Sequence, residues 1–200
     1  MTNSHNPEQS NPRYPFARLS ESGQKIAFIF LFALTLIVLA SLQALGAPLN
    51  TETAPMGIVS FEFAGELAPA QRMVESWGQE GRVYAGLSLG LDYLFLVAYA
   101  SAISLGCVLV ARSLARRVKF LPGIGAVLAW AQFAAALLDA VENYGLIRVL
   151  LGSDQAAWPV VAWWCAVPKF IIVALGLGYV IVGALVALVV RTRSAEARRS

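Results

Sequence analysis

The sequence predicts an all-α integral membrane protein, a four-transmembrane-helix bundle with one extracytoplasmic loop that carries a short amphipathic helix. Of its 200 residues, 58% are hydrophobic and only 14% are charged, whereas an ordinary soluble domain is about 45–50% apolar and about 25% charged. The apolar residues gather in four stretches, each long enough to cross a bilayer, and the basic residues gather between them. These three observations predict the fold class.

A membrane-spanning helix needs about 20 apolar residues. The four spans are predicted at residues 26–45, 83–111, 120–151 and 159–190, within a transmembrane domain of residues 25–190. The last three exceed the required length, so we expect them to be tilted or to extend past the headgroups.

Both ends of the chain are predicted to be polar tails. Residues 1–24 contain three prolines and little periodicity, which indicates a flexible cytoplasmic tail, and residues 191–200 form a basic cytoplasmic tail. A cleaved signal peptide is the alternative for the first span, because Ala44-Leu45-Gly46 has small residues at a suitable spacing for cleavage. Signal peptides have apolar regions of about 7–15 residues, shorter than this one, so we expect the span to stay uncleaved.

The distribution of basic residues predicts the orientation. Arginine and lysine occur in the N-terminal tail, between the second and third spans, and at the C-terminus (Arg13, Arg18, Lys25, Arg112, Arg116, Arg117, Lys119, Arg191, Arg193, Arg198, Arg199). The other two loops contain mainly acids. This positive-inside pattern places both termini in the cytoplasm, and with no organelle signal it suits a bacterial plasma membrane. The net charge of +3 reflects topology and predicts no nucleic-acid partner.

The outer loop, residues 46–82, is the largest exposed segment. Ala70, Met73, Val74 and Trp77 follow the i, i+3, i+4, i+7 spacing of an apolar helix face. This predicts a short helix beginning near Pro69 and lying across the outer mouth of the bundle.

Two further features of the loop stay open on sequence grounds. Residues 58–63 fit either a short strand or the start of a helix. Glu62 and Glu66 have two interpretations, as a lid over a buried site or as ordinary loop charges, and the sequence favours ordinary loop charges.

Four ionisable residues lie inside the apolar stretches: Asp92, Asp139, Glu142 and Lys169. Charge in hydrocarbon is costly, and such residues usually face a protein interior or a wet cavity and have a partner. Counting from the outer ends at about 1.5 Å per residue puts all four roughly 13–18 Å down. Three helices are therefore predicted to place ionisable side chains at one common depth in the membrane.

The spacing along each helix predicts which residues share the site. Asp139, Glu142 and Asn143 fall on one face of the third span. The ligand-binding or proton-binding candidates are Asp92, Asp139, Glu142, Asn143 and Lys169, and the supporting candidates on the same stripes are Ser88, Tyr99 and Gln132. Asp139 and Glu142 are the expected protonatable pair, Asp92 the second acid and Lys169 the counter-ion. Because three acids face one base, either one carboxyl stays protonated or a cation binds.

Three functions remain open on sequence grounds. The leading hypothesis is binding or translocation of a small cation, a proton or an amphipathic ligand from the outer side. The alternative is a structural or assembly role, in which the buried charges only hold the helices together. The second alternative is a membrane enzyme acting on a lipid, for which no catalytic residue is evident.

Several chemistries are not predicted. The chain has no nucleotide-binding glycine loop and no Cys-x-x-Cys motif, and its single histidine, His5, lies in the polar tail. Cys107 and Cys165 both lie in apolar stretches, so a disulfide is not expected. Acidic side chains alone do not select a metal, and the nearby lysine argues against one. We predict no metal and no cofactor, and the sequence gives no oligomeric state.

Overall fold

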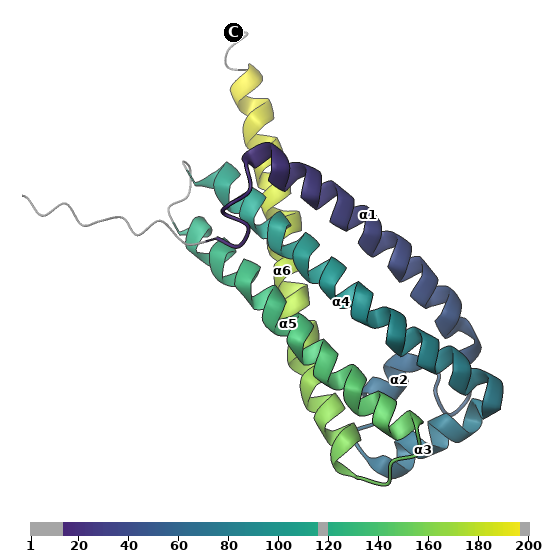
Figure 1. Ribbon diagram of the computed structural model, residues 1–200. Helices are drawn as coiled ribbons and strands as arrows, with labels where there is room; N and C mark the ends of the chain where they lie inside the picture. The colour runs from purple at the N-terminus through teal and green to yellow at the C-terminus, as the bar shows by residue number, and fades with distance from the viewer. Residues whose placement is uncertain (1–13, 116–119, 197–200) are drawn as a thin grey trace, which may run out of the picture.

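The computed structural model describes residues 14–115 and 120–196, and within these ranges every regular element is a helix. Four helices are long and apolar enough to cross a membrane: α1 (Glu21–Gly46), α4 (Gly78–Leu114), α5 (Leu121–Leu150) and α6 (Ala157–Glu196). They run side by side along most of the molecule (Figure 1). This confirms the prediction of an all-α chain with four apolar helices.

Two helix ends differ from the predicted ones, and a local cap sets the first of them. Helix α1 begins at Glu21, inside the predicted tail, where the Ser20 hydroxyl accepts a hydrogen bond from the Gly23 amide at 3.1 Å. Helix α6 continues to Glu196, into the predicted basic tail. Residues 1–13, 116–119 and 197–200, which include Arg13, Arg116, Arg117 and Lys119, lie outside the described residues.

Residues 14–20 pack onto the helices instead of forming part of a flexible tail. The Tyr14 hydroxyl donates to the Pro122 carbonyl at 3.3 Å, and the Gln24 amide donates to the Phe16 carbonyl at 3.0 Å. Arg112 on α4 donates to the Gln24 side-chain oxygen at 2.9 Å. These contacts join α1, α4 and α5 at one end of the molecule. The prolines of the tail led to the prediction of flexibility. The Tyr14 hydroxyl and the Gln24 amide nevertheless supply hydrogen bonds that hold this segment against the helices.

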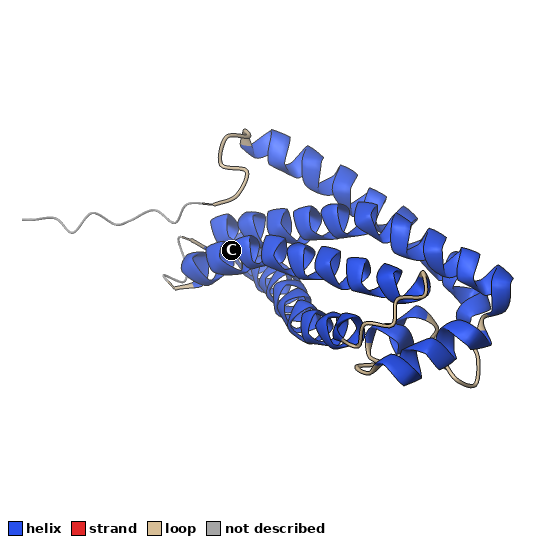
Figure 2. Cartoon of the chain, turned by 60° about the horizontal axis from the view of Figure 1, so that its bottom comes forward, coloured by secondary structure: helices blue, strands red, loops and turns tan. Residues whose placement is uncertain are grey.

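The connection between α1 and α4 folds into a small cap, which we define as η1 (Ala47–Leu49), α2 (Ile58–Glu62) and α3 (Leu67–Ser76). Figure 2 shows it beneath one end of the long helices. Residues 58–62 are helical, and α3 begins two residues before Pro69 and buries Ala70 and Val74. The Trp77 indole donates to the Leu49 carbonyl at 2.8 Å. The buried apolar residues of the cap pack in one cluster with Leu89 of α4 and Leu146 of α5, so the cap is docked onto the long helices.

Helix α4 is the central helix, and the other three long helices pack against it. Its Gly106 allows α1 and α6 to meet on its surface, because a Cβ there would lie 2.9 Å from a methyl of Val180 and 3.4 Å from the Phe28 ring. Apart from this region, α1 packs against α4 and makes few contacts with α6. Figure 2 shows α1 at the edge of the bundle. The space between α1 and α6 is where the candidate site lies.

Candidate functional site

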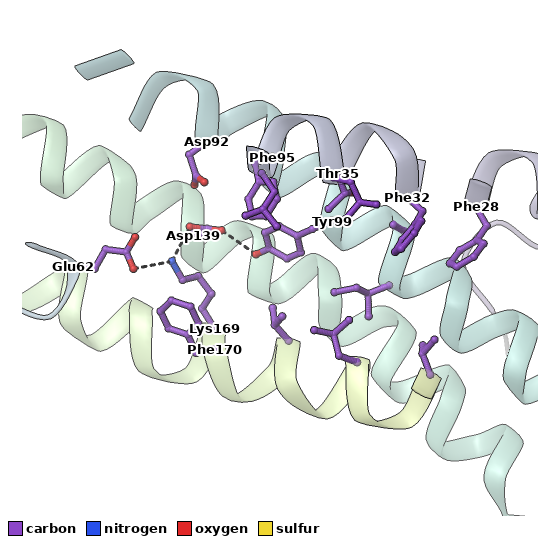
Figure 3. Close-up of a pocket in the computed structure, with 17 residues that line it drawn as sticks. Phe28, Phe32, Thr35, Glu62, Asp92, Phe95, Tyr99, Asp139, Lys169 and Phe170 are labelled. Carbon is purple, nitrogen blue, oxygen red and sulfur yellow. Dashed lines mark hydrogen bonds and ion pairs between the residues drawn. The ribbon is translucent and has the colours of Figure 1, made fainter. Parts of the chain in front are cut away.

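Lys169 on α6 is the centre of a buried ion-pair network. Its ammonium nitrogen lies 2.9 Å from Asp139 Oδ1 and 2.8 Å from Glu142 Oε2, both on α5. Glu62 Oε2, on the cap helix α2, lies 3.8 Å away. The Lys169 residue is only 5% exposed and Glu142 is fully buried. One ammonium group therefore holds together two long helices and the cap (Figure 3).

Two further hydrogen bonds connect α4 to α5 at this level. The Tyr99 hydroxyl donates to Asp139 Oδ2 at 2.9 Å, so the Asp139 carboxylate joins a phenol on one side and an ammonium on the other. The Asn143 amide donates to Asp92 Oδ2 at 2.6 Å. Asp92 is thus held by an amide and stays outside the ion pairs of Lys169.

Most of the residues predicted to share a site lie together. Tyr99, Asp139, Glu142 and Lys169 form one connected network. The Asp92–Asn143 pair lies beside it, because Asp92 lines the same cavity as Asp139 and Lys169. Gln132 instead donates to the carbonyls of Leu128 and Ile172, where it packs against Gly176 and seals α5 against α6. Ser88 is buried on α4 and lies outside the residues that line the cavity described below. Both are buried on the predicted helix faces, but each lies at a different level of its helix from the ion pairs of Lys169.

Glu62 is the member of the cluster that the sequence analysis did not select. Interpreted as an ordinary loop charge, it is in fact a largely buried residue, with its side chain 12% exposed. Burial raises the pKa of its carboxyl, and the nearby Lys169 ammonium opposes that shift. The signal in the sequence was its neighbour Phe61, a fully buried ring that anchors this segment in the protein interior.

A cavity of about 430 Å³ begins at this cluster and continues along the helices. Its polar end contains Glu62, Asp92, Asp139 and Lys169. The rest of its wall is almost entirely apolar, formed by Phe28, Phe32, Thr35, Leu36 and Leu39 of α1, by Phe95, Tyr99, Ala102 and Ile103 of α4, and by Phe170, Val173, Leu177 and Val180 of α6. Figure 3 shows the acids at one end and Phe28 at the other. The cavity is therefore amphipathic along its length.

The charges at the polar end do not balance. Four carboxyl groups, those of Glu62, Asp92, Asp139 and Glu142, face one ammonium. Glu62 Oε2 and Glu142 Oε1 are buried and receive no hydrogen bond from any described residue. Each of these oxygens can still accept a hydrogen bond, and a buried acceptor without one is energetically costly.

The Asp139 and Glu142 carboxyl groups are arranged around the Lys169 ammonium. No group of three or more His, Cys, Asp or Glu side chains in residues 14–115 and 120–196 is placed to hold a metal ion. The Lys169 ammonium already occupies the point between Asp139 and Glu142 that a cation would take. Comparisons with protein-family profiles, with curated proteins and with solved structures found no match to this chain.

Proposed function

We propose that this is a polytopic protein of the bacterial plasma membrane that binds an amphipathic ligand entering from the outer leaflet. In the proposed topology the four long helices form a transmembrane bundle with both termini in the cytoplasm and the cap outside. The basic residues Lys25 and Arg112 support this orientation, because they lie at the end of α1 and α4 opposite the cap (Figure 1).

The same orientation fixes the depth of the cluster. Twenty residues separate Asp92 from Arg112, and nineteen separate Asp139 from Phe120. At 1.5 Å per residue these are about 30 Å and about 28 Å, close to the roughly 30 Å thickness of the hydrocarbon core. The acids would then lie near the outer edge of the hydrocarbon, and the outer ends of the helices would rise through the headgroups to the cap.

The observation that carries the proposal is the match between the cavity and a membrane amphiphile. A polar head would sit among the acids, and an apolar chain would extend toward Val180. Eleven residues separate Lys169 from Val180 on α6, or about 16 Å, close to half of the roughly 30 Å hydrocarbon core. The groove therefore has the length and direction of one chain in the outer leaflet.

Access from the side follows from the packing of α1. Because α1 makes few contacts with α6, the side chains between them are only half covered: Leu36 is 49% exposed and Leu177 is 43% exposed. Both line the cavity. A ligand dissolved in the bilayer could reach the groove between α1 and α6 without leaving the hydrocarbon.

A structural role is the second candidate, favoured by one observation. Asp139 and Glu142 pair directly with Lys169, and the ion pairs join α2, α5 and α6. On this account the carboxylates only stabilise the fold, as buried polar contacts in membrane proteins do. The two candidates differ in whether the groove binds anything.

The test is binding of four tritiated tetradecyl compounds, which carry an amine, a trimethylammonium, an alcohol or a carboxylate head, to the protein in phosphatidylcholine nanodiscs. At least one should bind saturably above empty nanodiscs. Leu177→Trp should then lower its affinity by at least about tenfold, because the indole fills the groove. Leu175→Trp is the matched control: Leu175 is 57% exposed on the same helix and does not line the cavity.

Leu36→Trp, on the opposite wall, repeats the test from α1 in case Leu177→Trp disturbs folding. Saturable binding that survives both substitutions, or no binding by any of the four compounds, would contradict the proposed function and leave the structural role.

A further inference from the structure

We infer that the ligand's head is an organic ammonium, a protonated amine or its alkylated form; this inference rests on the proposed function. Charge complementarity is the first argument. The cavity's polar end holds Glu62, Asp92 and Asp139, with Glu142 directly behind them, and Lys169 is the one basic residue among its lining residues, all of which are described. A cationic head corrects this excess, whereas an anionic head increases it.

The second argument is which carboxyl groups Lys169 leaves available. Asp139 and Glu142 hold its ammonium at 2.9 and 2.8 Å, while Glu62 Oε2 lies at 3.8 Å and receives no hydrogen bond. Asp92 has only the Asn143 amide as its recorded partner among the described residues. Glu62 and Asp92 are therefore the two acids that a new donor would engage, through charge-assisted hydrogen bonds.

The third argument is the aromatic wall beside these acids. Phe95, Tyr99 and Phe170 line the same end of the cavity (Figure 3). The face of an aromatic ring attracts a cation within about 6 Å, and Lys169 Nζ already lies 4.7 Å from the centre of the Phe170 ring. Rings combined with carboxylates suit an organic ammonium, which presents both charge and C–H surface.

A neutral alcohol satisfies less of this site. It can donate one hydrogen bond to Asp92 or Glu62, but it brings no positive charge to a site that contains more acidic than basic groups. The head group therefore determines which amphiphile binds, while the apolar groove accepts the chain of any of them.

Asp92→Asn tests the inference with little disturbance of the fold. The asparagine oxygen can still accept the hydrogen bond from Asn143, and the ion pairs of Lys169 do not involve this residue. In the nanodisc assay at pH 7, tetradecylamine should bind the wild-type protein at least about tenfold more tightly than tetradecanol. Asp92→Asn should lower the affinity for the amine about tenfold and the affinity for tetradecanol much less. Glu80→Gln, an exposed acid on the same helix, should change neither.

The trimethylammonium compound refines the result. If it binds as tightly as the amine, the preference over tetradecanol comes from charge and ring contacts. If it binds more weakly than the amine, N–H donation contributes to that preference. Both results support an ammonium head. The inference is overturned if tetradecanol or the carboxylate binds the wild-type protein as tightly as the amine, or if Asp92→Asn weakens all heads equally. Provided that Leu177→Trp still blocks binding, the proposed function survives that result, so the two failures are distinguishable.

Discussion

Replacing Lys169 with methionine is expected to lower the free energy of unfolding by about 3–5 kcal/mol, the usual cost of breaking a buried ion pair by removing one partner. Methionine keeps most of the volume of the side chain, so the loss of stability reflects the missing positive charge and not a change in packing. Without the ammonium, Asp139 and Glu142 lose partners at 2.9 and 2.8 Å and remain buried. The measurement is thermal or denaturant-induced unfolding of the purified protein in a mild detergent.

A compensating variant separates charge from packing. Lys169→Met combined with Asp139→Asn and Glu142→Gln removes the uncompensated carboxylates, and should recover most of the lost stability. Lys25→Met is the matched control, because its pair with Glu21 is exposed on α1 and should matter little. If Lys169→Met unfolds like Lys25→Met, the buried network does not stabilise the protein.

Asp139→Asn is expected to lower tetradecylamine affinity by about 100-fold, equivalent to about 2.7 kcal/mol. Asp139 lines the head end of the cavity and also neutralises Lys169. Its replacement removes one attraction for the cationic head and leaves the Lys169 ammonium less compensated beside it. The effect should therefore exceed that of Asp92→Asn, which removes an attraction for the cationic head but leaves the ion pairs of Lys169 intact.

The control for this variant is Tyr99→Phe, which removes the other partner of Asp139 and keeps its charge. It should change amine affinity much less than Asp139→Asn. Insertion is checked by recovery of the variant in the membrane fraction and by its helical circular dichroism. Unchanged amine binding by Asp139→Asn, together with a lower melting temperature, would favour the structural role of the cluster.

The helices could be predicted from the sequence because length and hydropathy decide them. The unusually long apolar stretches of residues 83–111, 120–151 and 159–190 correspond to α4, α5 and α6. Their ends could not be placed as well, since they depend on single contacts. The Ser20 cap starts α1 five residues before the apolar stretch, and Arg112 binding to Gln24 draws residues 14–20 against the helices.

The cluster could be predicted in part because helical spacing fixes direction. Asp139 and Glu142 share a face, and charge at a common depth on three helices predicted that Lys169 would meet them. Glu62 could not be placed, because no spacing rule says where a loop folds back over a helix. The cavity itself was also beyond the sequence, since it results from α1 packing on α4 and leaving α6 uncovered.

The most direct test of the central claim is to locate the end of a bound chain. A tetradecylamine with a photoreactive diazirine at the tail end is bound to the protein in nanodiscs, irradiated, and mapped by mass spectrometry with and without excess unlabelled tetradecylamine. We expect labelling that the competitor removes at the inner end of the groove, around Phe28 on α1 and Val180 on α6. Competitor-insensitive labelling spread over the outward residues Val127 and Leu137 of α5, which are 69% and 67% exposed, would contradict the account.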